Sequence, residues 1–193
     1  MKKVFLLLLA AMILAPAMGQ IKKKLVTEPF NSIKAGGVSN IRLIKGDEHV
    51  VIIEAPEKVM DKIKVSVSDG RLSISYSNLK LKNHESLNFY ITLPDIQSID
   101  LSGAAELETV NAFTTDSFDL EASGATEIDM ELDVKKLNAH VSGAADVTLT
   151  GKAVYENIIA SGAADFDADE LVADTVKVVA SGASSVTPVS TGL

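Results

Sequence analysis

The tripeptide Ser-Gly-Ala occurs five times in the second half of this 193-residue chain, at intervals of about 20 residues. Such a period is typical of solenoids, whose units cannot bury an apolar face alone and stack so that neighbours share one core. Because Ser, Gly and Ala are small, we expect the copies to lie directly above one another, with glycine at a bend. The predicted corner residues are Ser102, Gly103, Ser123, Gly124, Ser142, Gly143, Ser161, Gly162, Ser181 and Gly182.

Apolar residues on both sides of each tripeptide are spaced by two, as in a strand with one buried face. Five residues after the serine the units carry Leu107, Ile128, Val147, Phe166 and Val186, and three residues before it Ile99, Leu120, Ala139, Ile158 and Val178. Each unit is predicted to hold two short strands that meet at the Ser-Gly-Ala corner, followed by a polar turn. The predicted fold is all-β, a right-handed parallel β-helix or solenoid with about 20 residues per coil.

The first part of the mature chain, residues 20–96, is strand-rich but irregular. Two alternating runs flank Asp69-Gly70, which predicts a β-hairpin. The segment 57–63 predicts one or two helical turns, and the basic run Lys22-Lys23-Lys24 is expected to be a solvated tail. We expect residues 20–96 and the repeats, 97–193, to form a single domain in which the irregular portion covers one open end of the stack.

Residues 1–19 have the features of a secretory signal peptide. Lys2 and Lys3 precede an apolar run that is too short to span a bilayer, and small residues follow at the predicted cleavage site after Gly19. The chain has no cysteine, so we expect no disulfide and no lipid-modified cysteine. The sequence predicts an exported protein, without a transmembrane segment in the mature chain, in the periplasm, at the outer-membrane surface or outside the cell.

The formal net charge of -8 argues against nucleic acid or an anionic lipid surface as a partner, since phosphate binding requires clustered lysine and arginine. Arg42 and Arg71 are the only arginines of the sequence, and tryptophan is absent. The composition therefore does not indicate a stacking platform for bases or sugars. The sequence leaves the oligomeric state open.

Five motifs follow one another along the mature chain. They are Phe30-Asn31-Ser32-Ile33, the segment 38–46, the segment 69–74, Leu93-Pro94-Asp95-Ile96 and Leu101-Ser102-Gly103-Ala104. In this order they resemble the putative auto-transporter adhesin, head GIN domain family of envelope proteins, and the resemblance covers nearly the whole mature chain. It implies an exported β-helical protein with an adhesive role, and no catalytic residues accompany it.

Acidic side chains recur four residues after the repeat serines, at Glu106, Glu127, Asp146 and Asp165. Stacking places carboxylate over carboxylate, which costs roughly 1 kcal/mol per pair at ~5 Å in water. One interpretation is a stripe that binds a divalent cation such as Ca²⁺, which prefers several carboxylate oxygens. The interpretation that we favour is a solvated face whose repulsion prevents sideways association. The glycine-rich loop of calcium-binding β-rolls is absent from the sequence, so no cofactor is expected.

Catalytic motifs have little support in the repeats. Glu127 and Asp129 could imitate a glycosidase pair, but acids that alternate along a repeated face are typical of a solvated surface. No general base accompanies the repeated serines, which are therefore interpreted as structural. The three histidines, His49, His84 and His140, lack the spacing of metal ligands.

The sequence thus predicts a non-catalytic envelope or cell-surface protein, an adhesion or binding module for glycans or surface proteins. The alternative is a structural or stress-related periplasmic protein without a dedicated ligand, and the third hypothesis is a polysaccharide-acting enzyme. A flat repeated face would favour binding or scaffolding. A groove that crosses the stack, with converging carboxylates and a base, would favour the enzyme.

Overall fold

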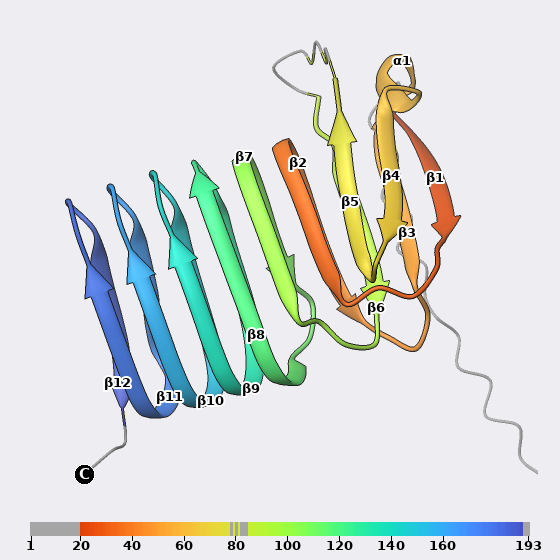
Figure 1. Cartoon of the computed structure of the whole chain (residues 1–193). Coiled ribbons are helices and arrows are strands. Elements are labelled where there is room, and N and C mark those ends of the chain that lie inside the picture. Colours follow the sequence, from red (N-terminus) through yellow and green to blue (C-terminus); the bar gives the residue numbers. More distant parts are fainter. Residues whose placement is uncertain (1–19, 78, 80, 82–84, 191–193) are drawn as a thin grey trace, which may run out of the picture.

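The computed structural model describes residues 20–77, 79, 81 and 85–190. The predicted signal peptide, residues 1–19, and His84 lie outside this part of the chain. Apart from one short helix, the regular elements of the described residues are β-strands. They join one sheet of 12 strands that is mostly parallel (Figure 1). The prediction of an all-β protein is therefore confirmed.

The first part of the chain supplies six strands and the helix. They are β1 (Gln20–Val26), β2 (Ser32–Lys45), β3 (Val50–Pro56), α1 (Glu57–Met60), β4 (Ile63–Ser68), β5 (Arg71–Tyr76) and β6 (Asn88–Leu93). Strands β4 and β5 form the hairpin predicted at Asp69-Gly70, where both turn residues have positive φ, of 52° and 73°. The predicted helical turn is confirmed by α1, which is shorter than the segment assigned to it.

Strand β1 corrects one expectation. The basic run Lys22-Lys23-Lys24 is part of a strand that pairs antiparallel with β3 along its whole length, and it is not a solvated tail. The Nζ atom of Lys22 lies 3.4 Å from Oε2 of Glu54 and 5.8 Å from the centroid of the Tyr90 ring. Because lysines on an outer strand oppose pairing with other chains, the run protects this end of the sheet.

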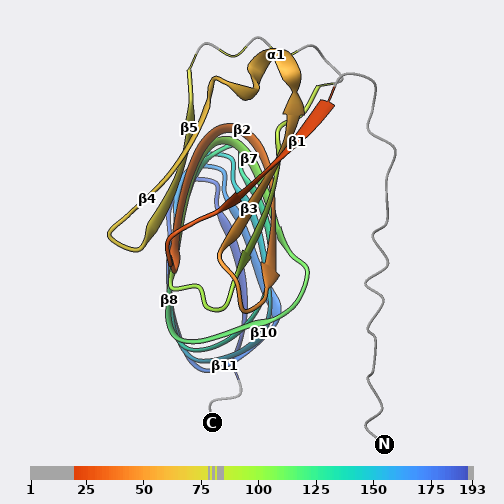
Figure 2. The same ribbon diagram turned by 90° about the vertical axis from the view of Figure 1, so that its right-hand side faces the viewer.

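The repeats supply the other six strands. They are β7 (Ser98–Thr109), β8 (Phe113–Gly124), β9 (Glu127–Val141), β10 (Asp146–Ala160), β11 (Asp165–Ala180) and β12 (Ser185–Ser190). Each strand pairs in parallel with the next, so that each repeat unit lies against its neighbour in the chain. The strands stand side by side in Figure 1, and in Figure 2 their curved ribbons superpose in one elongated outline.

Strands β9, β10 and β11 are longer than predicted. The segment expected to be a polar turn remains paired, so that β9 runs without a break from Glu127 to Val141 and curves (Figure 2). Neighbouring units bend at the same position, which allows the backbone pairing to continue through the bend. An irregularity occurs between β10 and β11, where the register shifts between Thr148 and Thr150.

One continuous apolar core contains residues from both parts of the chain. The position five residues after the repeat serine is buried in four units, at Leu107, Ile128, Val147 and Phe166. Phe89, Phe113 and Phe118 are also fully buried, so these aromatic rings are core residues.

Candidate functional site

The repeat glycines form a row that also contains Gly37 of β2. Gly37 is the register partner of Gly103, and Gly103 of Gly124, with φ values of 82°, 89° and 92°. The row continues because the amide of Ala144 donates to the carbonyl of Gly124 at 2.8 Å, and the amides of Ala163 and Ala183 repeat this contact on the next two glycines. Strand β2 thus carries an additional copy of the corner, in which Gly36-Gly37 takes the place of Ser-Gly.

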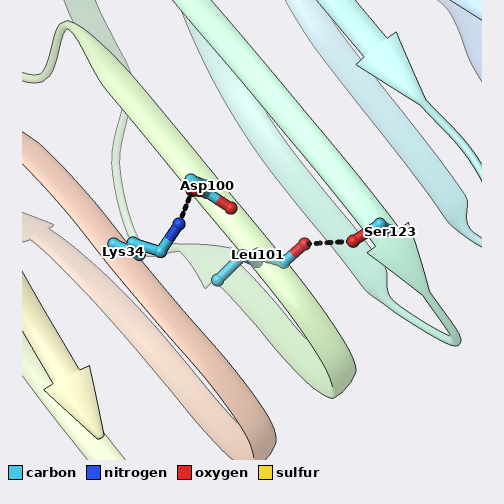
Figure 3. Close-up of polar contacts among 4 residues, drawn as sticks. All are labelled: Lys34, Asp100, Leu101 and Ser123. Carbon is cyan, nitrogen blue, oxygen red and sulfur yellow. Dashed lines mark hydrogen bonds and ion pairs between the residues drawn. The ribbon is translucent and has the colours of Figure 1, made fainter.

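Close backbone contact explains why the corner contains glycine. A Cβ atom on Gly143 would lie 2.5 Å from the carbonyl oxygen of Gly124, and the same approach recurs at Gly162 and Gly182. The hydroxyls of Ser123 and Ser142 donate to backbone carbonyls of the preceding unit. Oγ of Ser123 donates to the carbonyl of Leu101 at 3.5 Å (Figure 3). The contacts that the structure shows at the corner are therefore structural, and the non-catalytic role of its serines stays a prediction.

The ion pair of Lys34 and Asp100, also drawn in Figure 3, joins β2 to β7 beside this corner. The two residues are register partners on the two strands. A second ion pair, between Arg42 and Glu108, joins the same strands further along. These pairs tie the first part of the chain to the first repeat strand.

The acidic stripe lies as the repeat alignment places it. Glu106 is the register partner of Glu127, Glu127 of Asp146, and Asp146 of Asp165. All four side chains are exposed, and the row continues to Ser185. Within the described residues no group of three or more His, Cys, Asp or Glu side chains is arranged to hold a metal ion. The cation stripe stays a prediction.

A groove of about 950 Å³ crosses strands β8 to β11 at the bend that lies half a repeat from the glycine corner. Its charged lining consists of Asp95, Asp116, Asp119, Asp133, Lys135, Lys152 and Asp174. Hydroxyl groups and valine side chains fill the surface between these charges. The sequence predicted a polar turn here and no hollow.

The register of the strands builds the groove as rows. Thr114, Asp133, Lys152 and Val172 are successive partners on β8, β9, β10 and β11. With strands ~4.8 Å apart, such a row spans about 14 Å. The next row carries Thr115, Val134 and Ala153, of which Val134 and Ala153 are buried. An alignment of the repeats on their polar segments, rather than on Ser-Gly-Ala, would have brought these residues together.

Acidic side chains outnumber basic ones in the lining of the groove, which contains five aspartates and two lysines. Nζ of Lys135 lies 2.7 Å from Oδ1 of Asp116, and both side chains are largely exposed. Because a net negative surface repels anions, the groove suits an uncharged or amine-bearing ligand better than an acidic polysaccharide. No group of three or more His, Cys, Asp or Glu side chains among the described residues, those of the groove included, is arranged to hold a metal ion.

Glu156 was missed by the sequence analysis. Its side chain is fully buried, and neither carboxylate oxygen has a hydrogen-bond partner among the described residues. Its register partners on β9 and β11 are Leu137 and Val176. Burial in this apolar column raises the pKa of Glu156 to about 7. The signal was available, because the position five residues before the serine holds an apolar residue in the units on both sides.

Comparisons with known proteins agree with this architecture. A family model described as putative auto-transporter adhesin, head GIN domain, matches residues 29–192. A putative adhesin from Bacteroides fragilis is similar in structure, with a TM-score of 0.84, 28% identity, and coverage of 90% of this chain and 81% of that chain. A putative adhesin from Parabacteroides merdae shares the fold at a TM-score of 0.67 and 16% identity, over 86% of this chain and 80% of that chain.

A putative lipid binding protein from Parabacteroides distasonis also shares the fold, at a TM-score of 0.65 and 10% identity, over 84% of this chain and 79% of that chain. At that identity the likeness concerns the fold alone. No curated protein matches the sequence. The part of the chain that the structure describes contains no helix with the length and apolar character needed to cross a membrane.

Proposed function

We propose, because the chain belongs to the putative auto-transporter adhesin, head GIN domain family, that it is an exported, non-catalytic binding module of the cell surface. Its repeats are proposed to form a right-handed parallel β-solenoid. The parallel pairing of successive units and the glycine row support this architecture. The right-handed sense follows from the general preference of parallel β connections.

The groove across β8 to β11 is the observation that carries the binding proposal. It is open to solvent and lined by residues of four neighbouring strands, and it offers hydroxyl and carboxylate acceptors together with two lysine donors. An extended chain that displays hydroxyl groups can form hydrogen bonds with successive rows of such a groove. We therefore propose that the ligand is an uncharged or amine-bearing glycan chain, and that acidic glycans are excluded by the aspartates.

The arrangement of the polar groups supports a role without catalysis. A glycosidase places two carboxyl groups on either side of one bond, and a retaining enzyme needs them about 5 Å apart. Asp116, which faces the groove, is paired with Lys135 rather than with a second acid. Two of the corner serines, Ser123 and Ser142, donate their hydroxyl protons to backbone carbonyls, as a structural role requires.

A glycan array with the purified mature chain tests the proposal. We expect neutral or amine-bearing linear glycans to bind, and the variant Val154→Arg to lose that binding, since Val154 lies in the groove and is 50% exposed. The matched control is Val110→Arg, because Val110 is 62% exposed and does not line the groove. Equal binding by both variants, or preferential binding of acidic glycans, would contradict the assignment of the groove.

A further inference from the structure

A second, smaller pocket lies where four connections between strands of the first part of the chain meet. Its volume is about 270 Å³, and its walls come from residues 29–31, His49, Gly70 and residues 94–95. These residues belong to the connections β1–β2, β2–β3, β4–β5 and β6–β7, which lie at the lower ends of these strands in Figure 1. The pocket therefore joins four segments that are distant from one another in the sequence.

Backbone hydrogen bonds hold the walls of this pocket together. The amide of Asn31 donates to the carbonyl of Gly70 at 3.0 Å, and the amide of Gln97 donates to the carbonyl of Asn31 at 2.7 Å. The amide of Thr27 donates to the carbonyl of His49 at 3.1 Å. Each of the four connections is thereby tied to at least one other, which gives the pocket a fixed frame.

His49 contributes a hydrogen-bond donor to the wall of the pocket. Its Nδ1 atom accepts the backbone amide of Phe30 at 3.3 Å, and the centroids of the two rings lie 5.1 Å apart. Because an accepting Nδ1 carries no proton, the neutral ring carries its proton on Nε2. The Nε2 atom has no hydrogen-bond partner among the described residues, so the ring offers one N–H donor to a ligand.

Asp95 supplies the complementary acceptor. Its Oδ1 atom is shielded from solvent and has no hydrogen-bond partner in the part of the chain that the structure describes. An unpaired, desolvated carboxylate oxygen is costly, and a donor from a ligand removes that cost. Since the terminal torsion of an aspartate is broad and roughly two-fold, the carboxyl group can turn either oxygen toward such a donor.

The chemistry of the walls selects the class of ligand. Pro29 and Pro94 are exposed and offer C–H surface, whereas Phe30 is buried and provides no stacking platform. A carboxylate and an imidazole N–H in one small pocket match hydroxyl groups, which donate and accept, and the carboxylate repels an anion. The volume of about 270 Å³ lies below the roughly 300–1,000 Å³ of pockets for drug-sized ligands, so the space suits one sugar ring rather than a chain.

We propose that this pocket is a subsite for a single neutral sugar ring, whose hydroxyl groups bond to His49 and Asp95 and whose C–H surface lies against the two prolines. Asp95 also lines the groove across β8 to β11. In this one respect the inference rests on the proposed function, because a glycan held in the groove can place one of its rings in the pocket. Binding of a single sugar by the pocket does not require the groove.

NMR titration of the isotope-labelled mature chain with the methyl glycosides of glucose, galactose, mannose and N-acetylglucosamine tests the subsite. We expect at least one of them to shift the amides of Asn31, Gly70 and Asp95 in a saturable manner. His49→Asn should weaken this binding at least tenfold, because asparagine keeps an acceptor for the Phe30 amide and lacks the Nε2 donor. The matched control is His140→Asn, since His140 is exposed and lines neither the pocket nor the groove. The same spectra establish that the variants are folded.

A second comparison tests the role of Asp95 with the methyl glycoside of glucuronic acid. We expect the wild type to prefer the neutral glycoside over the acidic one, and Asp95→Asn to reduce that preference. Binding of glycans on the array without a shift by any single sugar, or with His49→Asn equal to the control, would overturn the subsite and leave the proposed function intact. Single-sugar shifts at the pocket without binding on the array would support the subsite and refute the groove.

Discussion

The buried carboxyl of Glu156 makes the stability of the fold depend on pH. Burial raises its pKa from 4.5 to about 7, whereas the unfolded chain keeps the ordinary value. Between these values the folded state holds a proton that the unfolded state has released. Stability is therefore highest below about pH 4.5 with respect to this group, falls as the pH rises towards 7, and levels off above it.

The size of the effect follows from the same shift. At about 1.4 kcal/mol per pKa unit, ionisation of Glu156 costs on the order of 3 kcal/mol of unfolding free energy at pH 8. This is a large share of the 5–15 kcal/mol that is typical of a folded domain. The carboxylate lies between Leu137 and Val176, with no hydrogen-bond partner among the described residues to offset the cost.

Urea unfolding of the wild type, Glu156→Gln and Glu127→Gln at pH 5 and pH 8 measures this contribution. We expect Glu156→Gln to be close to the wild type at pH 5 and more stable by about 3 kcal/mol at pH 8. The control Glu127→Gln, on the exposed stripe, should change little between the two pH values. Other ionisable groups act equally on wild type and variant, so the difference isolates Glu156. A Glu156→Gln protein with the same pH dependence as the wild type would refute this reasoning.

Three further outcomes are expected. Gly143→Ala should destabilise the fold by roughly 3 kcal/mol or more in urea unfolding, because its Cβ would meet the Gly124 carbonyl at 2.5 Å in addition to the strain of positive φ. Gly70→Ala, which has positive φ but 3.6 Å of space, should cost only about 1 kcal/mol, and equal losses would contradict the stacked corner. Calcium should neither release heat in calorimetry nor raise the melting temperature, and a clear rise that Glu127→Gln abolishes would make the acidic stripe a cation site. Sequencing of the exported protein should begin at Gln20, and a chain that retains residues 1–19 would exclude the proposed signal peptide.

The regular part of the fold could be predicted from the sequence because the same residue pattern, with the same physical effect, recurs in every repeat unit. The apolar positions spaced by two, the small corner residues and the hairpin at Asp69-Gly70 each follow from local sterics and patterning. Strand β1 was not readable in this way. Its lysines suggest solvent, and they belong to a strand only because β3 offers an edge that is distant in the sequence.

The groove was missed for a different reason. Its residues lie in segments that read as polar turns when each unit is considered alone, and they become one surface only when four strands curve together. A turn in one unit would have ended the strand. Pairing between neighbouring units instead holds the backbone extended through the bend, so the tertiary context overrides the local signal.

A repeated backbone presents the same surface at every step, so the positions that depart from the repeat are the informative ones. Glu156 interrupts an apolar column, Ser185 ends a row of acids, and Gly151 lies where a Cβ would meet the Leu132 carbonyl at 2.1 Å. Stacking accounts for Gly151, because a side chain there would meet the neighbouring strand, but it gives no reason for the buried carboxyl of Glu156. The polar groove lies mainly on β8 to β11 and the buried carboxyl on β10, so functional variants should be sought there rather than at the glycine corner.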